Sequence, residues 1–178
     1  MIETRRLEPA DRERWEELFR AYLRFYEREL GQPAYDRAWR EIGSDARLHG
    51  LGAWLDGELV GLAHFLVHPS SSEPDLCYLE DLFTDPAVRG RGVARALIGA
   101  VRDRAREEGC GSVYWQTHES NTLARRLYDE VGTFGGYIVY SLAVDGAGDR
   151  AGSGAGSGAG AGDGDGGGDR GAEDVGAR

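Results

Sequence analysis

The chain has 178 residues, enough for one folded domain, and its 31 acidic and 21 basic residues give it a net charge of −10. An acidic surface repels the phosphates of nucleic acids and favours cationic ligands, so the composition argues against a nucleic-acid partner. The sequence has neither a secretory leader nor an apolar run near the ~20 residues that a membrane helix needs, which predicts a cytoplasmic protein with no membrane partner.

The N-terminal part of the sequence predicts one strand and two helices. From Trp15 to Tyr26 an apolar side chain recurs at every third or fourth residue, which is the spacing of one buried helix face. The expected elements are a strand at 2–7, a helix opened by Pro9-Ala10-Asp11 and stopped by Gly31-Gln32-Pro33, and a shorter helix at 35–42.

The middle of the sequence predicts a β-hairpin followed by a third strand. Asp56-Gly57 is a dipeptide that two-residue hairpin turns favour, and apolar stretches flank it on both sides. The expected elements are strands at 51–55 and 59–67, a loop rich in Pro and Ser at 68–75, and a strand at 76–84 that ends at Asp85-Pro86.

The remaining part of the domain alternates helices and strands. The expected elements are a helix at 92–107, a strand at 112–117, a helix at 121–131 and a last strand at 137–144. Strands joined through helical crossovers predict an α/β (α+β) fold, in which a mixed central β-sheet is flanked by helices. The strands before and after the helix at 92–107 are expected to be parallel neighbours.

The C-terminal segment differs sharply in composition from the rest of the chain. Half of the 28 glycines lie after position 145, and Val175 is the one larger apolar residue there. Such a segment cannot bury enough apolar surface to offset the entropy of ordering it. We therefore expect a domain at 1–144 and a disordered tail at 145–178. The lack of lysine, together with so much Gly and Ala, is typical of a GC-rich bacterial genome.

A loop between the predicted strand and the next helix has the features of a phosphate site. Residues 89–94 read Arg-Gly-Arg-Gly-Val-Ala and run directly into the helix, where no side-chain cap is evident. Unpaired N–H groups at a helix N-terminus bind anions, and the two glycines let phosphate oxygens approach the backbone. A Walker loop is excluded because the chain has no lysine. A dinucleotide-binding loop is disfavoured because Arg95 stands where the third glycine belongs.

The sequence of this loop resembles the Arg/Gln-x-x-Gly-x-Gly/Ala signature of the GNAT superfamily of N-acetyltransferases. The preceding residues 79–86 resemble the family's fourth strand, and residues 113–121 and 124–128 resemble its fifth strand and fourth helix. The wording Tyr-Trp-Gln-Thr-His-Glu is most similar to the branch of the yeast histone/polyamine acetyltransferase and its D-amino-acid acetyltransferase relative. The resemblance covers 51–142 well.

The resemblance implies acetyl-coenzyme A as the co-substrate and no metal. It implies that backbone groups of Leu82–Thr84 pair with the pantetheine arm, that the amides of 88–94 hold the pyrophosphate, and that Asn121 contacts the coenzyme. The residues so implied are Leu82, Phe83, Thr84, Arg89, Gly90, Arg91, Gly92, Val93, Ala94 and Asn121. Tyr128 matches the tyrosine that protonates the departing sulfur, although its spacing is also that of a core tyrosine.

Three residues are candidates for the general base. Glu80 and Asp81 are adjacent on a predicted strand, where successive side chains point to opposite faces, so at most one of them is expected to serve the site. We favour Glu80, acting directly or through water. His118, just after the next strand, is the third candidate, because an unperturbed histidine titrates near pH ~6.5.

The acceptor amine is expected to bind near the first two helices. Most of the aromatic row there is expected to be core, whereas Phe25 and Tyr26 resemble part of the acceptor pocket in the polyamine and amino-acid branch. The leading hypothesis is acetylation of a small primary amine, a polyamine or an amino acid, in a ternary complex. The alternatives are acetylation of a protein lysine or N-terminus, and a non-catalytic module that senses acetyl-coenzyme A. The family resemblance also carries the expectation of a homodimer.

Overall fold

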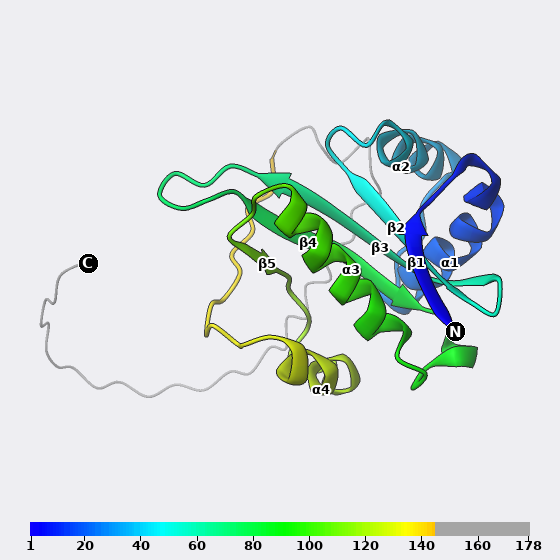
Figure 1. The fold of residues 1–178 in the computed structure, drawn as a ribbon. Helices are drawn as coiled ribbons and strands as arrows, with labels where there is room; N and C mark the ends of the chain where they lie inside the picture. Colours follow the sequence, from blue (N-terminus) through cyan, green and yellow to red (C-terminus); the bar gives the residue numbers. More distant parts are fainter. Residues whose placement is uncertain (145–178) are drawn as a thin grey trace, which may run out of the picture.

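The computed structural model describes residues 1–144, which form one sheet with helices against both faces (Figure 1). The tail predicted at 145–178 lies outside the described residues. The elements are, in chain order, β1 (Ile2–Arg6), the 3-10 turn η1 (Pro9–Asp11), α1 (Arg12–Phe25), α2 (Gln32–Ser44), β2 (His49–Leu55), β3 (Glu58–His68), β4 (Leu76–Thr84), the 3-10 turn η2 (Pro86–Val88), α3 (Val93–Glu107), β5 (Ser112–Tyr114) and α4 (Thr122–Val131).

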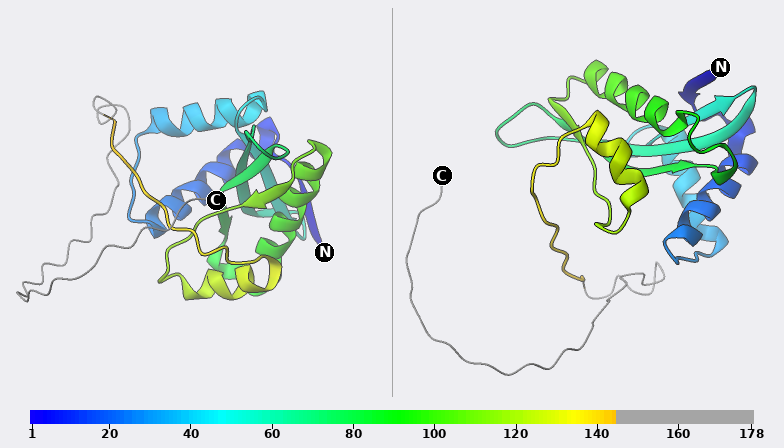
Figure 2. Two further views of the ribbon diagram at one scale, coloured as in Figure 1. Left: turned by 90° about the vertical axis from the view of Figure 1, so that its left-hand side faces the viewer. Right: turned by 90° about the horizontal axis from the view of Figure 1, so that it is seen from below.

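The sheet has the strand order β1-β2-β3-β4-β5, so every strand lies beside its neighbour in sequence. The first three pairings are antiparallel, and β4 pairs with β5 in parallel. Helix α3 connects these two parallel strands and crosses one face of the sheet, while α1 and α2 cover the opposite face (Figures 1 and 2). The parallel pair on either side of α3 confirms the expectation from the sequence, and the mixed sheet is the predicted α/β class.

One apolar cluster lies on each face of the sheet. Leu97 and Val101 of α3 are fully buried against one face, and Trp15 of α1 is fully buried against the other. Gly61 on β3 allows α3 to approach closely, because a Cβ atom there would lie 2.8 Å from Cγ1 of Val93. The tight fit between β3 and the first turn of α3 sets the position of the loop that precedes this helix.

The two strongest turn signals in the sequence had different outcomes. Asp56 and Gly57 have φ values of 55° and 88°, and two successive positive φ angles are those of the predicted hairpin turn. The prediction that Gly31-Gln32-Pro33 ends the first helix is wrong. Helix α1 ends earlier, at Phe25, and Gly31 is instead the N-cap of α2 with Pro33 in its first turn. Proline suits a first helical turn because the N–H that it lacks would have no partner there.

The predicted last strand at 137–144 is wrong for the described structure. These residues have no regular secondary structure and their large side chains are exposed. Their β-branched and aromatic composition favours a strand, but a strand also needs a partner for its backbone groups. The predicted strand at 112–117 is likewise shorter, since β5 ends at Tyr114.

Candidate active site

Strands β4 and β5 pair over only three residues and then separate. The paired positions are Leu76 with Ser112, Cys77 with Val113, and Tyr78 with Tyr114. Strand β4 continues to Thr84. From Leu79 onward, the edge of β4 that faces β5 therefore has no neighbouring strand within residues 1–144. Backbone donors and acceptors on this edge are therefore available to an extended ligand.

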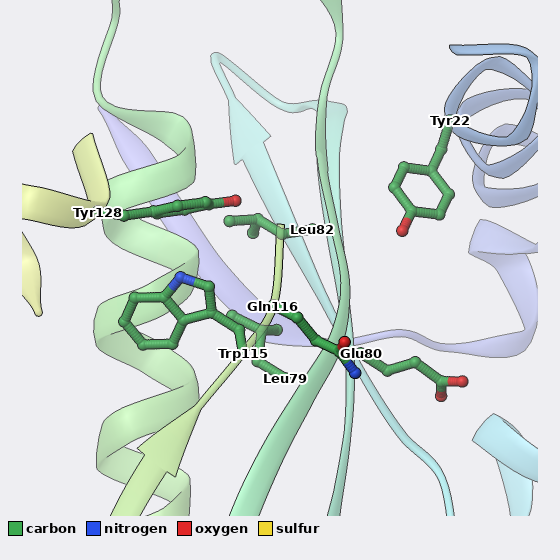
Figure 3. A pocket seen from close by; sticks show the side chains of 7 residues that line it. All are labelled: Tyr22, Leu79, Glu80, Leu82, Trp115, Gln116 and Tyr128. Atoms are coloured by element: carbon green, nitrogen blue, oxygen red, sulfur yellow. The ribbon is translucent and has the colours of Figure 1, made fainter. Parts of the chain in front are cut away.

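The side chains around this separation form a cleft. Four parts of the chain supply them: α1, β4, the segment after β5, and α4 (Figure 3). The lining residues are Tyr22, Leu79, Glu80, Leu82, Trp115, Gln116 and Tyr128. Glu80 and Tyr128 were both predicted as site residues, and the fold brings them to one cleft. Tyr22 belongs to the aromatic row that the sequence predicts to be mostly core, and the tertiary structure shows its hydroxyl directed to the cleft (Figure 3).

Tyr128 of α4 lies on one side of the cleft. Its ring packs edge-to-face on Trp115 with centroids 5.4 Å apart, and its hydroxyl points toward the free edge of β4 near Leu82 (Figure 3). Burial, and then the nearby Tyr26, raise the pKa of Tyr128 to about 12. The phenol is therefore held in its protonated, proton-donating form at neutral pH.

The loop before α3 exposes a set of backbone donors. Gly90 and Gly92 have φ values of 78° and 87°, which are left-handed conformations that glycine adopts without strain. Gly92 is the N-cap of α3 and has no side-chain cap. Within the described part of the chain, the N–H groups of residues 90–95 form no hydrogen bond. Unpaired donors at the positive end of a helix dipole are a ready site for a pyrophosphate.

Arginines surround this loop. Arg91 lies 3.6 Å from the carboxylate of Asp56 in the β2–β3 turn. Arg95 forms an ion pair with Glu130 of α4. All four of these side chains are more than half exposed, so the pairs are weak and leave the arginines accessible to an anion.

Glu80 and Asp81 point to the same face of the sheet, and the prediction of opposite faces is wrong. The cause is a β-bulge: Asp81 is opposite His64 of β3, and Leu79 is opposite the next residue, Phe65, so Glu80 has no partner. Leu79 and Phe65 both belong to the apolar cluster on the face of the sheet that α3 covers. Glu80 instead extends to the other face, on the side of Tyr22 (Figure 3). The extra residue keeps the following Asp81 on this side as well.

The negative charge of Asp81 acts on the titratable groups around it. Burial, and then the negative charge of Asp81, raise the pKa of Glu80 above that of an exposed glutamate. Burial and the charge of Asp81 also raise the pKa of Tyr22 and of Tyr26 on α1. The face of the cleft toward α1 is therefore negatively charged and lined by protonated phenols.

The other predicted residues lie around the rim. Asn121 caps α4, since its Oδ1 accepts from the N–H of Ala124 at 3.4 Å, and its Nδ2 donates to Oγ1 of Thr117 at 3.1 Å. His118 is exposed, with its ring 6.2 Å from that of Tyr26. Phe25 is 56% exposed at the end of α1. The contact of Asn121 with a coenzyme stays a prediction.

A metal centre is not evident in the part of the chain that the structure describes. Residues 1–144 hold no group of three or more His, Cys, Asp or Glu side chains arranged to bind a metal ion. None of the described helices is long and apolar enough to cross a membrane.

Comparison with known proteins gives a consistent result. The model of the family described as "Acetyltransferase (GNAT) family" matches residues 15–133. The chain is 33% identical over 134 residues to D-amino-acid N-acetyltransferase HPA3 of Saccharomyces cerevisiae, which covers 73% of this chain and 83% of that protein. It is 32% identical over 135 residues to the uncharacterized N-acetyltransferase YhfO of Bacillus subtilis, covering 71% and 87% of the two chains.

Solved structures show the same fold. The structure of AAC(6')-Iy in complex with the bisubstrate analog CoA-S-monomethyl-acetylneamine superposes with a TM-score of 0.71 at 23% identity, covering 81% of this chain and 98% of that one. A transcriptional regulator from Bacillus halodurans gives the same TM-score at 22% identity, covering 81% and 100%. At this level of identity the likeness establishes the architecture of the sheet and helices.

Proposed function

The chain belongs to the GNAT family of acetyltransferases, and from this premise we propose that it transfers the acetyl group of acetyl-coenzyme A to the primary amine of a small molecule, a polyamine or an amino acid, by direct attack in a ternary complex. The observation that carries the proposal is the cleft at the free edge of β4. There a carboxylate, Glu80 of β4, and a protonated phenol, Tyr128 of α4, line the same cleft. These are the two groups that acetyl transfer to an ammonium requires.

The coenzyme end of the site fits the residues present. The unpaired N–H groups of residues 90–95 suit the pyrophosphate. The free edge of β4 at Leu82–Thr84 suits the amide groups of the pantetheine arm, as an added strand would. Thr84 Oγ1 is buried without a hydrogen-bond partner in residues 1–144, which is what a missing polar ligand leaves behind. When bound, acetyl-coenzyme A supplies the thioester carbonyl that the amine attacks.

The acid and base roles follow from the charges in the cleft. An alkylammonium with a pKa near ~10.4 is almost entirely protonated at pH 7, so the enzyme has to remove a proton before attack. We assign this step to Glu80, directly or through water, because its raised pKa makes it a better base than an exposed glutamate. Tyr128 then donates its proton to the departing sulfur, since a phenol whose pKa lies well above 7 is protonated at neutral pH.

The acceptor side of the cleft favours a cation. Glu80 and Asp81 face α1, and Tyr22 and Tyr26 add aromatic rings beside them. A primary ammonium is attracted both by carboxylates and by aromatic faces. The relative from Saccharomyces cerevisiae is named for D-amino acids as acceptors, which supports the amino-acid class for this chain.

An acceptor panel tests the proposal. Release of free coenzyme A thiol would be followed with acetyl-coenzyme A and a series of polyamines, D- and L-amino acids, an aminoglycoside and a lysine-containing peptide. We expect turnover with at least one small cationic amine and none with the peptide. Turnover with the peptide alone would replace the proposal by a protein acetyltransferase. Binding of acetyl-coenzyme A, seen as thermal stabilisation, without turnover on any amine would indicate a sensing module.

We also propose that the protein is a homodimer. Seven large apolar or aromatic residues between Phe134 and Val144 are each at least 67% exposed in the single chain. Such a concentration of exposed apolar side chains marks an interaction surface. The outer edge of β5 carries no neighbouring strand within residues 1–144, and it offers backbone partners to an extended segment of a second copy.

A further inference from the structure

A buried histidine lies directly behind the acceptor side of the cleft. His64 on β3 is 1% exposed, and it is the one fully buried polar or charged side chain among residues 1–144. Its two ring nitrogens are both engaged. Nε2 lies 2.8 Å from Nε1 of Trp15 on α1, and Nδ1 lies 2.9 Å from Oδ2 of Asp81 on β4. The three side chains therefore form one hydrogen-bonded chain across three elements.

The chemistry of the partners determines where the protons are. An indole N–H can only donate, so Nε2 of His64 has to accept from Trp15 and carries no proton. The single ring proton is then on Nδ1, where it donates to the carboxylate of Asp81. The contact with Trp15 thus selects the neutral Nδ1–H form of His64, the form that can hold Asp81 as a hydrogen-bond acceptor.

The β-bulge at Glu80 places Asp81 on the α1 side of the sheet, beside Tyr22, which lines the cleft. The side chain of Asp81 is 17% exposed, so it is neither in the core nor free in solvent. The charge of Asp81 acts on Tyr22 and Tyr26 from α1 and on Glu80 from its own strand. Without a fixed donor behind it, an aspartate at a bulge would be free to adopt other rotamers.

We propose that Trp15 and His64 are positioning residues, which hold the Asp81 carboxylate at the acceptor side of the cleft so that it orients the ammonium group of the acceptor beside Glu80. The inference rests on the proposed acetyltransferase function. Hydrogen bonds in such a buried chain support one another, and a partly satisfied chain is costly, so loss of either donor should be felt at Asp81. Neither residue has to touch either substrate.

Substitutions of His64 separate positioning from packing. Asn places an amide N–H close to where Nδ1 of histidine lies and keeps the donor to Asp81, whereas Leu fills similar space without a donor. We expect His64→Leu to raise the KM for the acceptor amine by about tenfold, the effect of one hydrogen bond to a charged group, and to leave the KM for acetyl-coenzyme A unchanged. His64→Asn should recover most of this loss. His49→Leu is the matched control, because His49 also pairs with an aspartate, Asp45 at 2.6 Å, outside the cleft.

A spectroscopic measurement tests the hydrogen-bond chain without any substrate. In the wild-type protein, long-range ¹H–¹⁵N correlation spectra should show His64 protonated at Nδ1 and unprotonated at Nε2. Trp15→Phe removes the indole donor, so Nε2 of His64 loses its hydrogen bond, its ¹⁵N signal should shift, and the acceptor KM should rise. An Nε2–H form in the wild type would overturn the inference, as would equal kinetic defects in His64→Asn and His64→Leu.

The spectra and kinetics of Trp15→Phe also cover the case in which His64→Leu does not fold. Unchanged His64 signals together with an unchanged acceptor KM in Trp15→Phe would overturn the inference without the leucine variant. Failure of the wild type to acetylate any amine would overturn the proposed function, whereas the spectra report on the hydrogen-bond chain independently.

Discussion

Tyr78 and Tyr114 are the last two residues at which β4 and β5 pair, and their rings lie 5.0 Å apart. Nε2 of Gln116, two residues beyond Tyr114, donates to the hydroxyl of Tyr78 at 2.7 Å. These contacts hold the strands together at one point, and beyond it the chain after β5 turns away. The cleft with Glu80 and Tyr128 begins at that point, so the site is a consequence of where strand pairing stops.

Tyr128→Phe tests the general acid. Loss of the hydroxyl should lower kcat by about 10–100-fold, since general acid catalysis by one group typically contributes at least this much. Binding of acetyl-coenzyme A, measured by calorimetry, should stay the same because the ring and its packing on Trp115 remain. Tyr114→Phe is the control, because that hydroxyl bonds to His68 outside the cleft. A Tyr128→Phe enzyme with the wild-type kcat would leave Tyr128 only a packing role.

Glu80→Gln and Asp81→Asn together test the base. Glu80 has to be ionised to accept a proton, so kcat falls as the pH is lowered through its pKa. Burial and the charge of Asp81 raise that pKa, which moves the acid limb of the pH–rate profile upward. Asp81→Asn removes the charge and keeps the burial, so at saturating acceptor the limb should move to lower pH.

Glu80→Gln should remove this limb and lower kcat by about 100-fold or more. The measurement is kcat against pH for the wild type and both variants, with both substrates saturating. If the Glu80→Gln enzyme keeps its kcat within about twofold, Glu80 is not the base, and Asp81 and His118 are the remaining candidates. An acid limb that Asp81→Asn does not move would show that another group titrates there.

Much of the fold follows from local patterns in the sequence. The apolar spacing from Trp15 onward, the Asp56-Gly57 turn and the strand–loop–helix order around Gly92 all predict elements that the structure contains. The errors occur where a neighbour decides the outcome. Gly31 and Pro33 are equally compatible with the end of one helix and the start of the next. Only the structure shows that they begin α2. The predicted strand at 137–144 has no strand partner within residues 1–144.

The sequence predicts individual residues of the candidate site but not the contacts between the strands and helices that carry them. The prediction of Tyr128 rests on resemblance to a motif and that of Glu80 on strand alternation, and the fold brings both to one cleft. The bulge at Glu80 could not be inferred, because it depends on the register between β3 and β4, which alternation within one strand does not contain. His64 was missed for a related reason: in an apolar strand it looks like an ordinary core residue until Trp15 and Asp81 are placed on either side of it.

Gly92→Ala and Gly99→Ala form a matched pair for the phosphate loop. Gly92 has a φ of 87°, where a Cβ atom costs about 1–2 kcal/mol, whereas Gly99 lies inside α3 with nothing within 4 Å of an added Cβ. In urea unfolding, Gly92→Ala should therefore lower the free energy of unfolding by that amount and Gly99→Ala should raise it by about 0.5–1 kcal/mol.

The same pair separates stability from binding. We propose that the N–H groups of residues 90–95 hold the pyrophosphate. In Gly92→Ala the loop can relieve its backbone strain by turning these N–H groups away. The variant should then bind coenzyme A about tenfold more weakly, as measured by calorimetry. Gly99→Ala should bind as the wild type does. Equal affinities of all three proteins for coenzyme A would place the pyrophosphate elsewhere.

Ile138→Asp tests the proposed homodimer. Ile138 is 73% exposed in the single chain, in the middle of the apolar segment from Phe134 to Val144. A carboxylate at that position would be desolvated in an interface but would cost little on a free surface, so the substitution should dissociate the dimer without lowering the stability of the monomer. Light scattering during size-exclusion chromatography should give a mass of twice the 19.4 kDa of one chain for the wild type, and the mass of one chain for the variant.

Leu123→Asp is the control, because Leu123 is 63% exposed on α4 and lies outside the segment; this variant should remain dimeric. A wild-type protein that elutes as one chain at every concentration would refute the homodimer.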